Sequence, residues 1–227
     1  MKKVSLAIAF SLVMVAGFAQ KISRINISQT GTIQGIYLLL DDNVTVNLSV
    51  DGNISAYGVE VYSDRINSMS RLDPYPGRVE NYSQNDNEAF RGKLKYIGRN
   101  VITYYGTYDN EAYRGKVKTI GNQTFEYYSN FDDPSVKGKL KNIGPTPFSW
   151  YTSFDNEAFK GKVRSIGNTS FAYYASYEDK AYQGKIRTIG NANWTYYASF
   201  EKREYAGMVK SGSQFQTING IKFYIQY

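Results

Sequence analysis

Lysine and tyrosine recur at a fixed spacing along most of the chain, and these side chains are well suited to binding chemistry. Five lysines and five tyrosines share the pattern: Lys93, Lys116, Lys139, Lys162, Lys185, Tyr105, Tyr128, Tyr151, Tyr174 and Tyr197. Ammonium groups neutralise anionic groups, and phenol rings offer flat faces for stacking on a sugar or a base. These ten residues form the candidate ligand-binding site, and a glycan or another anionic polymer is the expected ligand.

The composition excludes several kinds of enzyme. The 227 residues include no His and no Cys, so the chain cannot hold a Ser-His-Asp triad, a Cys nucleophile, or a thiolate or imidazole metal site. Acidic residues at predicted turns, such as Asp109 and Glu111, leave open a calcium ladder or a glycan-active enzyme that uses paired carboxylates. Both are disfavoured, because the acidic turns repeat and keep no common set of ligands. We expect a non-enzymatic protein with no cofactor and no metal site, which acts as a binding or structural surface.

A 23-residue repeat predicts the elements that position these side chains. Copies begin, without insertions between them, at Asp86, Asp109, Asp132, Asp155, Glu178 and Glu201. Each copy holds two segments that alternate apolar and polar residues, separated by a glycine turn and by an acidic turn. Each copy is therefore expected to be a β-hairpin with strands of about seven or eight residues. The predicted fold class is all-β: an antiparallel meander of tandem hairpins in an elongated, single-layer sheet.

The register follows from keeping the apolar residues of each copy on one face. Pairing Leu94 with Tyr104 across the glycine turn, and Tyr108 with Tyr113 across the acidic turn, satisfies every copy. This pairing predicts glycines inside the strands and places the lysine and tyrosine rows on the face opposite the apolar one. It also predicts an outer aromatic row on the apolar face: Phe90, Tyr108, Tyr113, Phe131, Phe154, Phe159, Tyr177, Tyr182 and Phe200.

The first 19 residues have the layout of a bacterial secretory signal. Lys2 and Lys3 precede an apolar run, which closes on the small residues Gly17 and Ala19. We therefore expect export to the periplasm or the cell exterior, with no transmembrane helix after cleavage. The mature chain would carry 25 basic and 20 acidic residues, a net charge of +5. Export disfavours nucleic acid as the ligand and leaves a protein partner open.

The repeat boundaries suggest how the chain is organised. The signal peptide at 1–19 is followed by an N-terminal β cap at 20–58, degenerate repeats at 59–85, regular hairpin repeats at 86–207 and a C-terminal capping strand at 208–227. An outer-membrane β-barrel is an alternative that would suit the signal and the alternating strands. The predicted strands are shorter than the ~9–11 residues of a tilted membrane strand, which disfavours that alternative.

The repeats also resemble a known family over about residues 86–207. The 23-residue hairpin unit and the pattern Tyr113-x-Gly115 followed by Gly121 are similar to MORN repeats. The second strand departs from the MORN pattern, since Tyr127-Tyr128 stands where a further Gly-x-Gly is usual. The resemblance implies an elongated sheet of hairpins that serves in scaffolding and in lipid or protein contacts.

Overall fold

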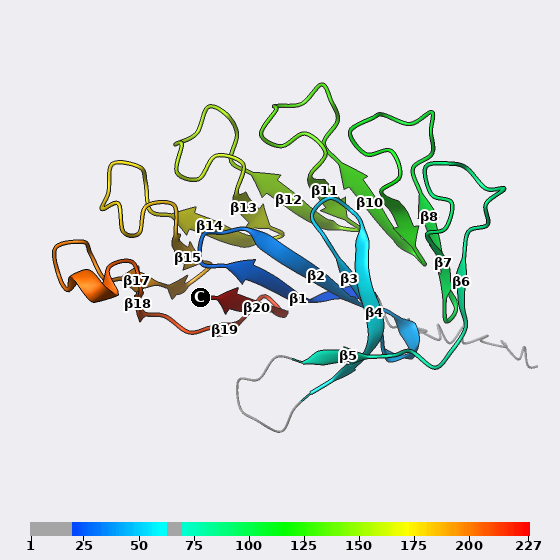
Figure 1. Ribbon diagram of the computed structural model, residues 1–227, viewed down its shortest axis with the longest axis horizontal. Helices are drawn as coiled ribbons and strands as arrows, with labels where there is room; N and C mark the ends of the chain where they lie inside the picture. Colours follow the sequence, from blue (N-terminus) through cyan, green and yellow to red (C-terminus); the bar gives the residue numbers. More distant parts are fainter. Residues whose placement is uncertain (1–19, 63–69) are drawn as a thin grey trace, which may run out of the picture.

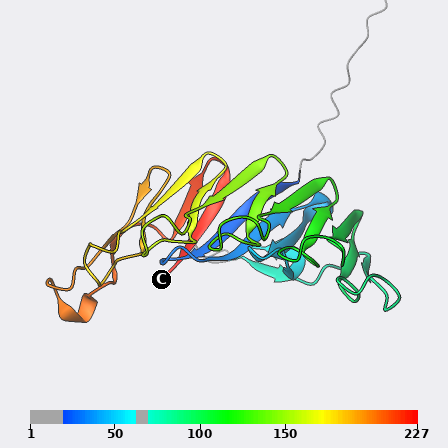
Figure 2. The ribbon, with the colours of Figure 1, turned by 90° about the horizontal axis from the view of Figure 1, so that it is seen from above.

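The computed structural model describes residues 20–62 and 70–227, so the predicted signal peptide lies outside the described residues. Two β-sheets pack face to face, with the repeats in one sheet and the two ends of the described chain in the other (Figure 1). Seen from above, the hairpins of the repeats follow one another along the long axis of the molecule (Figure 2). The described chain holds no helix with the length and hydrophobicity needed to span a bilayer.

The repeat sheet has eleven strands, and β6 and β16 form its open edges. Its strands are β6 (Val79–Asn81), β7 (Leu94–Ile97), β8 (Asn100–Tyr104), β9 (Val117–Ile120), β10 (Gln123–Tyr127), β11 (Leu140–Ile143), β12 (Thr146–Trp150), β13 (Val163–Ile166), β14 (Thr169–Tyr173), β15 (Ile186–Ile189) and β16 (Ala192–Asn193). All neighbours pair antiparallel. A separate pair, β17 (Thr195–Tyr196) and β18 (Val209–Ser211), continues the repeats around the short 3-10 helix η2 (Arg203–Tyr205).

The second sheet has seven strands in the order β19-β20-β1-β2-β3-β4-β5. They are β1 (Lys21–Ser28), β2 (Ile33–Leu39), β3 (Val44–Leu48), β4 (Ile54–Val61), β5 (Arg71–Asp73), β19 (Phe215–Ile218) and β20 (Ile221–Gln226), with the 3-10 helix η1 (Asp41–Asn43) before β3. The β1–β20 pair is parallel and joins the two ends of the described chain. Residues 20–58 supply strands to this sheet, residues 208–227 supply β19 and β20 to it and β18 to the separate pair, and residues 59–85 are divided between the two main sheets.

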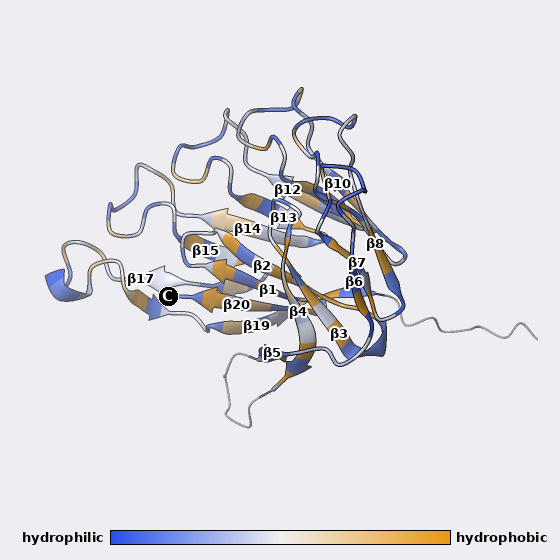
Figure 3. Cartoon of the chain, turned by 45° about the vertical axis from the view of Figure 1, so that its right-hand side comes forward, coloured by the Kyte–Doolittle hydropathy of each residue, from blue (hydrophilic) through white to orange (hydrophobic). Residues whose placement is uncertain are grey.

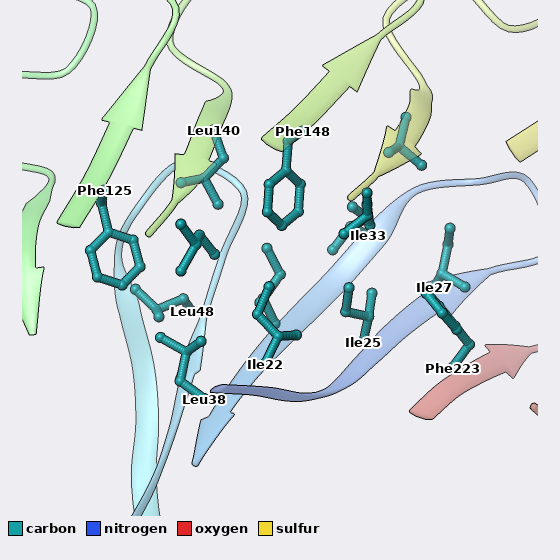
Figure 4. Close-up of a cluster of buried hydrophobic side chains, with 14 of the residues drawn as sticks. Ile22, Ile25, Ile27, Ile33, Leu38, Leu48, Phe125, Leu140, Phe148 and Phe223 are labelled. Atoms are coloured by element: carbon teal, nitrogen blue, oxygen red, sulfur yellow. The ribbon is translucent and has the colours of Figure 1, made fainter. Parts of the chain in front are cut away.

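The core lies between the sheets. Ile25, Ile27 and Leu38 of the second sheet face Phe125 and Phe148 of the repeat sheet (Figure 4), and all five side chains are at most 1% exposed. Alternation places Ile25 and Ile27 of β1, and Ile36 and Leu38 of β2, on this side, and bulges in the β1–β2 pair let Ile22 and Ile33 share it. Burial of apolar surface from both sheets is the main favourable contribution to this packing.

The all-β fold and the tandem antiparallel hairpins are confirmed, whereas the expected single layer is wrong. The apolar face of the repeats is covered by the second sheet, because aliphatic residues of β1, β2 and β3 pack on it. Repeat analysis alone could not anticipate this cover, since its strands lie outside the periodic segment and come from both ends of the described chain.

The strands are shorter than expected, with four or five residues in each complete hairpin of the repeat sheet. The register across the glycine turn differs by one residue from the predicted one, because Tyr96 pairs with Val101. Across the acidic side, Tyr104 pairs with Val117 while Thr103 pairs with Thr119, so Lys118 forms a β-bulge. The bulge lets Val117 and Ile120, three residues apart, both be fully buried.

Candidate functional site

Each repeat unit has a long loop at one edge of the sheet and a short glycine turn at the other. Units are numbered from the acidic residue that begins each one, so the second unit spans residues 109–131. Its strand β9 is entered from the loop that connects β8 to β9. Gly115 ends this loop with φ +73°, and a Cβ there would lie 2.7 Å from the Ala89 carbonyl oxygen of the unit before. The glycines expected inside the strands therefore stand at loop ends, where both backbone conformation and close packing require them.

The predicted tyrosines join neighbouring units. The Tyr105 hydroxyl donates a hydrogen bond to the Phe125 carbonyl oxygen at 2.9 Å. The equivalent bonds join Tyr128 to Phe148 (3.3 Å), Tyr151 to Phe171 (2.9 Å) and Tyr174 to Trp194 (3.0 Å). Tyr197, in the fifth unit, packs near Tyr205 with 5.5 Å between ring centroids. Burial is the main reason that the pKa of Tyr105 is raised to about 12.

The predicted lysines make a second set of bonds between units. The Lys116 ammonium donates to the Gly138 carbonyl oxygen at 2.5 Å and lies 5.4 Å from the centroid of the Tyr127 ring. The equivalent pairs are Lys93 with Gly115, Lys139 with Gly161, Lys162 with Gly184 and Lys185 with Gly207. Desolvation by burial lowers the pKa of all five lysines, and that of Lys162 falls to about 8.

The structure brings the ten predicted residues together. They lie on the same side of the sheet as Tyr127, whereas the sequence placed them on the opposite face. Tyr105 lies 6.0 Å from Tyr127, ring centroid to centroid, and Lys116 also approaches that ring. The predicted separation is wrong because Lys116 belongs to the loop before β9, where the two-residue alternation of a strand does not apply. We name the ten residues the Lys–Tyr ladder, because most of their polar groups already bond the next unit.

Basic side chains at the bulges enclose the ladder tyrosines further. The Lys118 ammonium lies 5.3 Å from the Tyr105 ring centroid, and the Tyr113 ring packs at 4.6 Å. The corresponding bulge cations are Lys141 over Tyr128, Arg164 over Tyr151, Arg187 over Tyr174 and Lys210 over Tyr197, and Lys95 lies in the same way over Tyr82, which is outside the ladder. A tyrosine between a cation and a second ring offers little face to a ligand.

The acidic residue that begins each unit closes its loop. Asp109 accepts a hydrogen bond from the Gly106 backbone N–H at 2.6 Å. The same bond joins Asp86 to Ser83, Asp132 to Ser129, Asp155 to Thr152, Glu178 to Ala175 and Glu201 to Ala198. The Ser129 hydroxyl also donates to Asp132 and is the largest cause of the lowered pKa of that carboxyl. In residues 20–62 and 70–227, no three acidic side chains gather into a possible metal site.

Side chains also tie each loop to the next one. The Asn110 side chain accepts a hydrogen bond from the Ala112 N–H at 3.0 Å and donates to Asn130 of the following loop. The same link between loops recurs where Asn156 donates to Ser176 at 3.0 Å. The loops project from one edge of the sheet (Figure 1) and are mostly hydrophilic (Figure 3). These bonds fix successive loops in a regular row.

One fully exposed aromatic side chain stands on each of five loops. The row consists of Tyr108, Phe131, Phe154, Tyr177 and Phe200, each between 83% and 102% exposed. The sequence grouped these residues with Phe90, Tyr113, Phe159 and Tyr182, which instead pack against the core. The nine residues separate into two sets because the segment expected to continue the strands is a loop. We call the five exposed residues the tip row. Each directly precedes the acidic residue that closes its loop, and this position in the sequence distinguishes the five from the buried aromatic residues.

The comparisons with known proteins identify the repeats. Residues 81–219 match the family model of the BspA type leucine-rich repeat region in six copies. No curated protein and no solved structure matches the chain. The match agrees with tandem repeats and does not confirm the resemblance to MORN repeats. Leucine-rich repeats generally have a strand followed by a helix or 3-10 turn, whereas the complete units here form antiparallel hairpins.

Proposed function

Since the chain belongs to the BspA-type leucine-rich repeat family, we propose that it is an exported, non-enzymatic protein that binds an extended glycan along the tip row. Repeats of this family are typically non-enzymatic and are often on bacterial surfaces. The observation that carries the proposal is the full exposure of five aromatic rings on loops that are held to one another. Exposed large apolar groups in a regular row mark an interaction surface better than scattered ones do.

The spacing of the row favours a sugar polymer. Successive tips are one hairpin apart, and two strand separations amount to about 9–10 Å, which is about the length of two sugar units in an extended chain. Aromatic rings stack on the apolar faces of sugars, and rings fixed by their loops lose little freedom on binding. The acid beside each ring disfavours an anionic membrane surface as the alternative partner.

A glycan array at two salt concentrations tests this proposal. We expect salt-insensitive binding of an extended polysaccharide, because stacking does not depend on charge screening. Replacing Phe131, Phe154 and Tyr177 together by Ala should weaken binding by at least about ten-fold. Tyr57→Ala is the matched control, since Tyr57 is an exposed aromatic residue outside the row. Unchanged binding by the triple variant would contradict the proposal.

The Lys–Tyr ladder is a second candidate surface, for a glycan carrying negative charge or for another polyanion. Each ladder ammonium has three donors, and the structure shows Lys116 using one of them on a backbone carbonyl. Binding through the ladder should fall steeply between the two salt concentrations. If the ligand is a protein and not a glycan, the protein should bind no glycan on the array. The triple tip-row variant should then lose binding to that protein partner.

A further inference from the structure

Two hairpin turns of the second sheet, called the first and second tips here and distinct from the tip row, reach the repeat sheet. Their carbonyl groups bond the backbone N–H of equivalent residues in several units. The first tip connects β1 to β2, and the second connects β3 to β4. Their carbonyl oxygens accept hydrogen bonds from backbone N–H groups of the repeats: Gly52 from Val117 (2.9 Å), Val50 from Leu140 (3.2 Å) and Gln29 from Ile186 (2.8 Å). Val117, Leu140 and Ile186 are the first strand residues of the second, third and fifth units.

The fourth unit lies between units that have this bond and lacks it. Its equivalent residue is Val163, and in the described part of the chain no carbonyl of either tip accepts its N–H. A cavity of about 700 Å³ opens there between the two tips. Val50 and Thr32 of the tips, with Trp150, Ser135, Lys139 and Lys162 of the repeats, are among its lining residues. A cavity of this size is typical of a small-molecule site.

The cavity carries positive charge that its own surroundings only partly balance. Lys139 and Lys162 each donate to a glycine carbonyl oxygen, and neither forms an ion pair with a carboxylate within the described residues. Asp51, on the second tip, favours the charged form of Lys139 from a distance. At the wall, the Asp133 carboxylate accepts hydrogen bonds from the backbone N–H groups of Ser135 and Ser153, so its lone pairs are already used there. Burial lowers the pKa of both lysines, so an anion between them would relieve an unfavourable desolvation. Lys160, also at the wall, pairs with Glu157 at 3.0 Å.

We infer that this cavity binds a uronic acid unit of an acidic saccharide, with the sugar carboxylate between Lys139 and Lys162. A carboxylate oxygen accepts hydrogen bonds from ammonium groups, and no tip carbonyl of the described chain covers the backbone of Val163, next to Lys162. The hydroxyl groups of Thr32 and Ser135 and the indole ring of Trp150 suit a sugar ring better than an acidic peptide. The inference is independent of the tip row, which lies on the exposed loops and takes no part in lining this cavity.

Isothermal titration with a galacturonic acid trisaccharide and with its neutral galactose counterpart tests the assignment. We expect the acidic trisaccharide to bind at least about ten-fold more tightly than the neutral one. Lys162→Met should weaken acidic binding by about ten-fold or more. Lys118→Met is the control, because Lys118 is a lysine of the repeats that lies outside the Lys–Tyr ladder and does not line the cavity. It should leave affinity within about two-fold of the original.

Three outcomes would overturn the inference: equal binding of the two trisaccharides, equal losses in the two lysine variants, or tighter Lys162-dependent binding of tetraglutamate, which would make the ligand a peptide. A measurement on the unaltered protein guards against misfolded variants. In lysine-labelled protein, the acidic trisaccharide should raise the pKa of Lys162 and leave that of Lys116 unmoved. Failure of this NMR titration leaves the tip-row proposal intact, since the triple aromatic variant tests that surface separately.

Discussion

The Lys–Tyr ladder and the tip row recur with the same period and are built from similar residues, yet their surroundings are opposite. Tyr151 in the ladder donates its hydroxyl to the next unit and packs 4.7 Å from Phe159, ring centroid to centroid. Phe154, three residues later, is 95% exposed. Both sets would look like binding motifs in a sequence alone. The difference teaches that a repeated aromatic residue marks a binding surface only when its faces and polar atoms are free.

The ladder also explains how consecutive units stay in register. Tyr105 and Lys116, at the two ends of one loop, each bond a carbonyl oxygen of the following unit. Energetics of repeat arrays depend on the contacts between nearest neighbours, so bonds of this kind set the cooperativity of the array. The tip row contributes nothing comparable to stability, which leaves its residues available for binding.

The largest expected effect compares a core phenylalanine with a tip phenylalanine in the same unit. Phe148→Ala should lower the free energy of unfolding by about 3–5 kcal/mol, because it opens a cavity between the two sheets. Phe154→Ala should change it by less than about 0.5 kcal/mol, since its ring is exposed. Urea denaturation followed by tryptophan fluorescence measures both. Similar losses in the two variants would show that the tip aromatics are also structural.

A smaller effect tests the ladder hydroxyl. Tyr151→Phe removes the donor to the Phe171 carbonyl oxygen and should cost about 1 kcal/mol. Tyr197→Phe is the matched control, because that hydroxyl donates no hydrogen bond among the described residues, and its effect should be within about 0.5 kcal/mol. Urea midpoints at constant m-value provide the comparison. If the two variants are equally stable, the ladder bonds contribute nothing measurable.

Periodicity predicted the units well because both turns leave strong local signals. The recurring acid at Asp109 and the glycine at Gly121 mark the same two turns in the first five units, and these turns are present. The alternation of Leu94, Tyr104 and Val117 also identified buried positions correctly. Local composition is enough for such features, because hairpin turns have specific backbone requirements.

The sequence misled where a strand pattern continued into a loop. Phe90 and Tyr108 fit the same alternation, yet the strands begin and end closer to the glycine turn. The bulge at Lys118 is equally hidden, since a lysine fits an exposed strand position as well as a bulge. The second sheet was missed because its packing depends on contacts between distant segments, such as Ile25 with the aromatic residues of the repeats.

The smallest predicted effect is a pH dependence that belongs to the ladder and not to the tip row. The pKa of Lys162 is about 8 in the folded protein against 10.5 ordinarily, so between these pH values the unfolded chain binds more protons. Stability should therefore rise with pH through this range, by a few tenths to about 1 kcal/mol per lysine, given their partial exposure. The raised pKa of Tyr105, about 12, acts in the opposite sense above pH 10, where the unfolded chain loses its tyrosine protons first.

Stability should thus pass through a maximum near pH 10, where the lysine contribution ends and the tyrosine contribution begins. Urea midpoints at about pH 7.5, 10 and 11.5 measure this profile. Lys162→Met should reduce the rise, and Tyr105→Phe should reduce the fall, because each removes one of the groups whose protonation differs between the folded and unfolded chain. The triple tip-row variant should keep the complete profile. An undiminished rise in Lys162→Met together with an undiminished fall in Tyr105→Phe, or a profile that is lost in the tip-row variant, would contradict the assignment of a structural role to the ladder.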